Sequence, residues 1–131
     1  MKYVFYAYGH ENMLATHEKT IEFTKDDFLT KKGDCIIGIR ADFNPEKIKK
    51  FLKFKKLKIT LSSGREKDEF FFEANPSFNS IHELVMRKTR FISDRTFGIG
   101  ADRSAAELSR KLFDKLKSPE RKIKAVIESC D

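Results

Sequence analysis

Apolar and polar residues alternate with a period of two along most of the chain, which is the pattern of β-strands. The clearest alternation covers residues 16–24, where threonines and glutamates occupy one face and His17, Lys19, Ile21 and Phe23 the other. β-Branched threonine suits a pleated surface, so this stretch is predicted to be a strand. Further strands are expected over residues 2–8, 35–41, 57–61, 69–74, 82–91, 95–101 and 123–127.

Two features of this pattern predict how strands pair. Residues 57–61 and 69–74 flank a short polar segment containing Gly64, which predicts a β-hairpin. The first three strands follow one another with only turns between them, so they are expected to be neighbours in an antiparallel meander.

Two helices interrupt the strands. Asn44-Pro45-Glu46 has an N-cap residue, a proline at the first helical position and an acid in the first turn, which predicts a helix reaching about Phe54. A second helix is expected from Ser104, because Ser104 and Glu107 have the spacing of a capping box. Its apolar residues recur every three or four positions as far as Ser118-Pro119.

The predicted fold class is therefore α+β, with a curved, mainly antiparallel sheet of seven or eight strands and two helices. Closure of the sheet into a barrel-like shape is left open. Residues 1–131 are expected to form a single domain, since no long linker or internal repeat divides the chain. A doubly wound α/β fold is disfavoured, because only two connections are helical.

Composition excludes several classes of protein. The 131 residues are 40% hydrophobic and include 13 phenylalanines, which is too apolar for a disordered chain. The longest apolar run, residues 3–9, is about a third of a membrane span, and no secretory leader is recognisable. Phosphate-loop, zinc-protease and serine-hydrolase motifs are missing from the sequence. The two cysteines, Cys35 and Cys130, have no disulfide pattern, and a reducing, cytoplasmic location is expected.

Charge adds one candidate surface. The chain has 27 Lys+Arg against 20 Asp+Glu, a formal charge of +7. Seven lysines and one glutamate fall between positions 45 and 58, and the predicted helix brings together Lys49, Lys50, Lys53 and Lys56. This segment is either a solvated helix face or a patch for a polyanion such as RNA. A patch of this kind predicts salt-dependent binding without sequence specificity.

A second candidate lies near the amino end, where His10, Asn12, His17 and Glu22 fall within a short span. These groups could supply metal ligands or an acid–base pair. The two histidines converge only if the chain turns between them, and their spacing matches no recognised metal motif. The alternative is that each imidazole is a strand-edge group hydrogen-bonded to backbone.

A third candidate combines Arg87, Lys88 and Arg95 with a helix start near Asp102. Guanidinium groups and free helical amides would together form a phosphate or carboxylate site. The alternative is structural, with Asp94 and Asp102 paired to the arginines.

Several separated motifs are familiar as a set. They are Gly9-His10-x-Asn12, Thr16-His17-x-x-Thr20-Ile-Glu22-x-Thr24, Leu29-Thr-x-x-Gly33-Asp-Cys-Ile-Ile-Gly38, Arg87-Lys-Thr, Asp94-Arg-Thr96 and Ala101-Asp-Arg-Ser-Ala105. From about Tyr6 to Leu116 the chain resembles an archaeal family of uncharacterised proteins, domain of unknown function 371.

The resemblance implies an archaeal cytoplasmic protein and supplies no reaction. The match departs at Lys19, where a second threonine is expected, and at Arg103-Ser104, where a lysine and an alanine are expected. The family motifs mark the positions His10, Asn12, His17, Thr20, Glu22, Asp34, Cys35, Arg87, Lys88, Asp94 and Arg95.

The leading hypothesis is binding of a phosphate-bearing partner, RNA or a nucleotide. The lysines would attract it without specificity, and Arg87, Lys88 and Arg95 would make directed contacts. A cleft beside them would be lined by His10, Asn12 and His17, and Thr20 and Asp94 are further candidate ligand-binding residues.

The alternative is a hydrolase or lyase acting on a small phosphorylated or carboxylated substrate. His17 or His10 and Glu22 would act as base or metal ligands, with Asp34 orienting one of them. The sequence requires no cofactor, although a divalent metal fits this alternative. A third possibility is an oligomeric or ribosome-associated structural protein. No membrane partner is expected, and the oligomeric state is not predicted.

Overall fold

A hairpin of two long strands forms the middle of the sheet. β4 (Lys56–Ser63) and β5 (Glu66–Ala74) pair antiparallel along their whole length, as predicted. Gly64 lies in the turn between them with a φ of +60°, a conformation that glycine adopts without a steric cost. The apolar positions of β4 are fully buried, so the period-two pattern assigns the core face of this hairpin.

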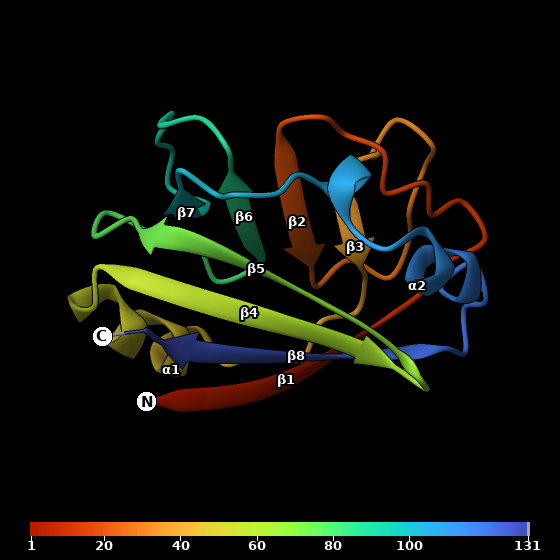
Figure 1. Ribbon diagram of the computed structural model, residues 1–131, viewed down its shortest axis with the longest axis horizontal. Coiled ribbons are helices and arrows are strands. Elements are labelled where there is room, and N and C mark those ends of the chain that lie inside the picture. Colours follow the sequence, from red (N-terminus) through yellow and green to blue (C-terminus); the bar gives the residue numbers. More distant parts are fainter. Residues whose placement is uncertain (131) are drawn as a thin grey trace.

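The computed structural model describes residues 1–130 and contains one eight-stranded mixed sheet (Figure 1). The other strands are β1 (Lys2–Tyr8), β2 (Thr20–Thr24), β3 (Ile36–Gly38), β6 (Glu83–Arg87), β7 (Thr96–Ile99) and β8 (Lys122–Ser129). Their order across the sheet is β1-β8-β4-β5-β7-β6-β2-β3. The pairs β2–β3 and β6–β7 are parallel and the remaining pairs are antiparallel, which confirms the α+β class with a mainly antiparallel sheet.

The sheet is strongly curved but does not close into a barrel. In Figure 1 the long strands β1, β8, β4 and β5 run along the molecule, and β6, β2 and β3 cross above them. The end of the edge strand β1 forms an isolated bridge with Ile39, the residue after the edge strand β3, where the Tyr8 N–H donates to the Ile39 carbonyl at 2.8 Å and the Ile39 N–H donates back at 2.9 Å. The core fills the space inside the curve, where Phe5 of β1 meets Phe23 of β2 edge-on at a centroid distance of 4.9 Å.

The predicted meander of the first three strands is wrong. β1 pairs with β8 from the other end of the chain, and β2 pairs with β6 and, in parallel, with β3. Apolar alternation determines which face of a strand is buried, but it carries no information about the neighbouring strand.

Several predicted strands are also shorter in the structure. The strand expected over 16–24 starts at Thr20, because the N–H groups of Thr16 and His17 both donate to the Asp34 carbonyl instead of joining a regular ladder. The strand expected over 82–91 ends at Arg87.

The first predicted helix is present as α1 (Pro45–Lys49) continued by the 3₁₀ turn η1 (Lys50–Lys53). Asn44 caps it, since its Oδ1 accepts a hydrogen bond from the Glu46 N–H at 2.9 Å. Among residues 1–130 there is no helix with the length and apolar character needed to cross a lipid bilayer.

The second predicted helix is not continuous. It is divided into the 3₁₀ turn η2 (Ala105–Glu107) and α2 (Arg110–Lys115), with Leu108 in an extended conformation between them. The division coincides with a contact that the helical pattern does not reveal, in which Asp68 of β5 accepts a hydrogen bond from the Ser109 N–H at 2.8 Å.

Candidate functional site

The strand β2 buries polar side chains on the face that points away from the core. Ile21 and Phe23 pack inside the curved sheet, so Thr20, Glu22 and Thr24 face the other side. All three are nevertheless buried, and Glu22 is only 6% exposed. A buried carboxyl group requires polar partners, and these identify the candidate site.

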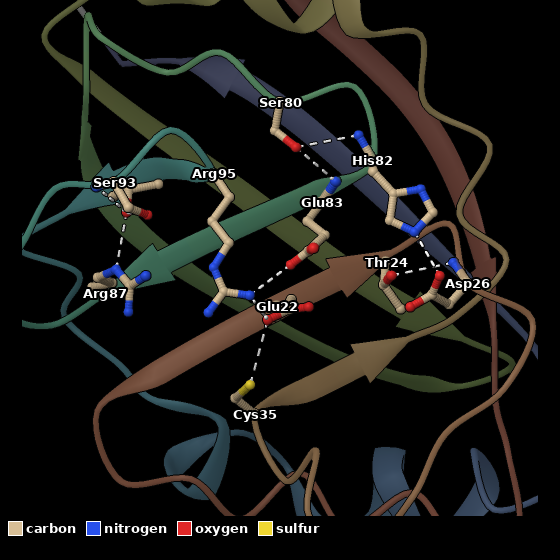
Figure 2. A network of polar contacts seen from close by, with 11 residues as sticks. Glu22, Thr24, Asp26, Cys35, Ser80, His82, Glu83, Arg87, Ser93 and Arg95 are labelled. Atoms are coloured by element: carbon tan, nitrogen blue, oxygen red, sulfur yellow. Dashed lines mark hydrogen bonds and ion pairs between the residues drawn. The ribbon is translucent and has the colours of Figure 1, made fainter.

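Three segments supply the partners of Glu22, as Figure 2 shows. The Cys35 thiol, which precedes β3, lies 3.6 Å from Glu22 Oε1 and donates to it. Arg95, which precedes β7, has its Nη1 3.7 Å from the same oxygen and 2.7 Å from Oε2 of Glu83 on β6. Arg95 therefore bridges two carboxyl groups from neighbouring strands. We refer to Glu22, Cys35, Glu83, Arg87 and Arg95 as the Glu22 cluster.

Burial dominates the ionisation of this cluster. It raises the pKa of Glu22 to about 7, with the negative charge of Glu83 and a hydrogen bond to that group adding to the rise and Arg95 opposing it. Burial, followed by the Glu22 charge, raises the pKa of the Cys35 thiol to about 12. At neutral pH Cys35 is thus a thiol, and Glu22 exchanges a proton in the physiological range.

Arg87 completes the Glu22 cluster from the end of β6. Its Nε–H donates to Thr96 Oγ1 at 3.0 Å, and its guanidinium carbon lies 5.0 Å from the centre of the Phe91 ring. Within residues 1–130 no carboxylate lies within ion-pair distance of it. Burial and the nearby charge of Arg95 lower the pKa of Arg87, although it stays protonated in the physiological range.

The structure brings together some of the residues singled out in the sequence. Glu22 and Arg95 are in contact, and Thr20 lies opposite Arg87 in the β2–β6 register. Lys88 points elsewhere, forming a 2.7 Å ion pair with Glu107.

The two amino-terminal histidines form local hydrogen bonds outside the Glu22 cluster. His10 Nδ1 accepts a hydrogen bond from the Asn12 N–H at 2.9 Å, and the Asn12 amide group donates to the Leu29 carbonyl. His17 Nδ1 accepts from the Lys19 N–H at 3.0 Å. These are local bonds between ring nitrogens and backbone.

Asp34 and Asp94, two acids singled out in the sequence, accept hydrogen bonds through their backbone carbonyls. The Asp34 carbonyl accepts from the N–H groups of Thr16 and His17, and the Asp94 carbonyl accepts from the Asn79 N–H. In the part of the chain that the structure describes, no group of three or more histidine, cysteine, aspartate or glutamate side chains is arranged to hold a metal ion.

Glu83 is the member of the Glu22 cluster that sequence reasoning missed. It alternates with Val85 and Arg87 along β6, so the three share one face of the strand. The alternation marks Glu83 as an acid on the same strand face as Arg87. Its place beside Glu22, however, depends on the pairing of β6 with β2, which the sequence does not reveal.

A second candidate surface lies where α1 and η1 meet the start of β4. It comprises Lys49, Lys50, Lys53, Lys55 and Lys56, and we refer to it as the lysine surface. Lys49 lies 3.8 Å from Glu46 and donates to Asn79 Oδ1 at 3.0 Å. The other four lysines form no ion pair with any carboxylate of residues 1–130.

A hollow of about 420 Å³ adjoins the lysine surface. It is lined by Lys55, Lys56, Phe71, Phe72, Glu73, Gly100 and Asp102. The Phe71 ring is half-buried on the outer face of β5, and Lys56 Nζ lies 5.2 Å from its centre. Positive charge and an accessible aromatic ring therefore occur side by side.

These features define an α+β protein with one open, mixed sheet, a partly buried acid–arginine cluster on one outer face and a separate lysine surface. The chain belongs to the family described as a domain of unknown function, DUF371, whose profile matches residues 5–130. It is also similar to an uncharacterised protein of Methanocaldococcus jannaschii, with 37% identity over 124 residues that cover 89% of this chain and 92% of that protein. The resemblance drawn from the sequence motifs is thereby confirmed.

Proposed function

We propose that the protein binds a phosphate-bearing partner, and that this partner is single-stranded RNA. The observation that carries the proposal is the lysine surface, whose charge is largely uncompensated, next to a hollow with an aromatic ring in its wall. Single-stranded nucleic acids are typically bound by this combination of a basic groove and aromatic side chains that stack on bases.

The charge distribution favours this surface over the larger hollow on the outer face of β8, β4 and β5. That hollow has a volume of about 660 Å³, and its lysines and arginine alternate with Asp68, Glu69 and Glu128. A polyanion is repelled there as well as attracted. The acids beside the lysine surface are Glu46, Glu73 and Asp102. Glu73 is already paired with Arg90 at 2.9 Å, and Asp102 Oδ1 accepts a hydrogen bond from the Phe71 N–H at 2.9 Å.

A chain of contacts connects the lysine surface with the Glu22 cluster. Asn79 accepts from Lys49 through its side chain and donates its N–H to the carbonyl of Asp94, the residue before Arg95. This connection supports a partner that extends from the lysines towards the arginines. The directed contacts expected of Arg87, Lys88 and Arg95 remain a prediction.

Salt dependence tests the electrostatic part of the proposal. Fluorescence anisotropy of a labelled single-stranded oligoribonucleotide would be measured from about 50 to about 200 mM salt. Each phosphate contact contributes about −0.7 to the slope of log affinity against log salt, so four lysines predict a slope near −3. Replacing Lys50, Lys53, Lys55 and Lys56 with glutamine is expected to flatten the slope and remove most of the affinity.

The matched control replaces Lys31, Lys32, Lys111 and Lys117, four exposed lysines that lie outside the lysine surface, with glutamine. It removes the same charge and is expected to retain most of the affinity. An equal loss of RNA affinity in both variants would show that net charge, and not the lysine surface, accounts for binding. Undetectable binding at the lowest salt concentration would overturn the proposal.

Stacking on Phe71 makes a separate prediction. Phe71→Leu keeps an apolar side chain on the half-buried outer face of β5 but removes the aromatic surface. Base–aromatic stacking is worth about 1–3 kcal/mol, so the affinity for RNA is expected to fall by about fivefold to about 150-fold. The salt slope should stay unchanged, since no charge is removed. Unaltered affinity would show that no base stacks on Phe71.

One observation favours the second candidate function, an acid–base reaction on a small phosphorylated or carboxylated substrate. The pKa of Glu22, raised to about 7 by burial, suits a general acid or base at neutral pH. Hydrolysis of a phosphate-ester reporter, compared between the unaltered protein and Glu22→Gln, tests this candidate. Equal rates in the two proteins would exclude Glu22 as the catalytic group.

A further inference from the structure

The Glu22 cluster contains two guanidinium groups, but its carboxyl groups contact only one of them. Arg95 lies within ion-pair distance of both Glu22 and Glu83, whereas Arg87 reaches neither. Figure 2 shows Arg87 and Arg95 on the same side of β6, with the Glu22 carboxyl beside the Arg95 guanidinium. The cluster thus presents a positive charge that has no carboxylate partner in the described chain.

Arg87 is held in a defined position despite lacking a carboxylate. Its Nε–H bond to Thr96 Oγ1 and its packing on Phe91 orient the guanidinium plane, leaving the terminal nitrogens without a hydrogen-bond acceptor among residues 1–130. Thr96 is itself fixed, because its hydroxyl also accepts from the Ser93 N–H at 3.1 Å. A preorganised guanidinium is well suited to the oxygens of an oxyanion.

The surroundings make this charge costly without a ligand. Arg87 is partly removed from water and lies near the like charge of Arg95. An anion beside the two arginines would relieve this repulsion and replace lost hydration.

We propose that Arg87 and Arg95, together with the buried carboxyl of Glu22, form a binding site for one tetrahedral oxyanion of the phosphate class, and that binding is linked to uptake of a proton by Glu22. The site deepens the directed-contact part of the proposed function. It does not depend on the lysine surface.

The proton linkage follows from the charges around Glu22. The groups that face it are Cys35 from the segment before β3, Glu83 and Arg87 from β6, and Arg95 from the segment before β7. An anion bound by the arginines weakens their stabilisation of the Glu22 carboxylate, so the bound state favours the protonated carboxyl. Binding should therefore be tighter at about pH 6 than at about pH 8, with a change of at most about tenfold for each unit by which the ligand raises the pKa of Glu22.

Sulfate is the probe, because its charge is constant over this pH range whereas that of phosphate is not. Sulfate would be titrated at constant ionic strength while the arginine Nε–H signals are followed by NMR. Saturable shifts are expected at Arg87 and Arg95, with at least threefold tighter binding at about pH 6 than at about pH 8. Shifts that do not saturate, or that leave Arg87 and Arg95 unmoved, would overturn the site.

Arg87→Gln is expected to abolish saturable binding. The matched control is Arg90→Gln, which removes the same charge three residues away from a guanidinium already paired with Glu73. Equal loss in both variants would overturn the assignment to Arg87. Arg87→Lys retains the charge without the bond to Thr96 and should bind weakly, which keeps the test decisive if Arg87→Gln folds poorly.

Glu22→Gln isolates the part of the pH dependence that comes from Glu22. The variant is expected to bind sulfate with nearly the same affinity at both pH values, and at least as tightly as the unaltered protein at about pH 8. A pH dependence that persists in Glu22→Gln would overturn the linkage. Sulfate binding without RNA binding would overturn the RNA proposal alone, and RNA binding without a sulfate response would overturn this site alone.

Discussion

Glu22 shows how a single residue on a strand acquires unusual chemistry. It alternates with Ile21 and Phe23 as any outward-facing strand residue would, yet it is buried because Arg95 and Cys35 lie over it. Removing a carboxyl group from water disfavours its charged form, which is the main reason that its pKa is raised to about 7.

This shift predicts the pH dependence of stability at the scale of the residue. Between about pH 4.5 and about pH 7 the folded state keeps a proton on Glu22 that the unfolded state has released, so the free energy of unfolding falls as the pH rises. The contribution of Glu22 to stability is fully present at pH values below its pKa in the unfolded protein. It is lost as the pH rises through the pKa of Glu22 in the folded protein. The upper bound of this loss is about 3 kcal/mol.

Thermal unfolding at about pH 5 and about pH 8 measures the effect. Glu22→Gln cannot ionise and is expected to show a smaller difference between the two pH values than the unaltered protein. An identical pH dependence in the two proteins would contradict ionisation of Glu22 as the cause.

At the scale of elements, Asp68 joins β5 to the segment between η2 and α2. Its carboxylate accepts from Arg103 Nη1 at 2.7 Å and from the Ser109 N–H at 2.8 Å, and its side chain is only 13% exposed. Because Ser109 is bound by Asp68 while Leu108 is extended, the chain restarts as a new helix instead of continuing the turn at Glu107.

Asp68→Ala is expected to destabilise the protein by about 2–4 kcal/mol, because it leaves a partly buried arginine and an amide without their acceptor. Chemical denaturation measures the change. The control is Glu69→Ala on the next position of β5, whose exposed carboxylate forms only a 3.7 Å contact with Lys58 and should cost less than about 1 kcal/mol. Similar costs for the two variants would contradict a role for Asp68 in joining the elements.

At the scale of the whole molecule, strands from opposite ends of the chain lie side by side. β8 fills the position between β1 and β4, with seven residue pairs to β1 and six to β4. Its residues Ile123, Ala125 and Ile127 are fully buried in the core. The last strand of the described residues therefore lies inside the sheet, between β1 and β4.

Deleting residues 122–131 is expected to abolish the cooperative thermal transition followed by circular dichroism, because β1 and β4 lose their shared partner and the core is opened. Deleting only residues 130–131 serves as the control and should preserve the transition. A cooperative transition in the longer deletion would show that the rest of the sheet folds without β8.

Local patterns predicted many of the individual elements correctly. The hairpin of β4 and β5, the helix start at Asn44 and the alternating β8 each depend on residues close together in the sequence. The capping interactions of Ser104 and Glu107 are also present, although they begin a 3₁₀ turn instead of a long helix. The pairing of the first strands was not predictable, because alternation is the same whichever strand lies alongside.

The two candidate sites differ in how far the sequence predicts them. The lysine surface could be found from the sequence, because its lysines lie within one short segment, although Lys56 is the first residue of β4 and not part of the predicted helix. Glu22 and Arg95 were both singled out as chemical groups, but their contact and the part played by Glu83 arise only from the β2–β6–β7 arrangement. The same arrangement leaves Arg87 without a carboxylate partner among residues 1–130.

The sequence by itself determined the α+β class, the buried face of most strands and the basic segment, since each depends on periodicity or on neighbouring residues. Tertiary structure alone decided the order of the strands and the ionisation of Glu22. Both depend on groups that are distant in the sequence, and the energy of a buried charge is set by whatever the fold places around it.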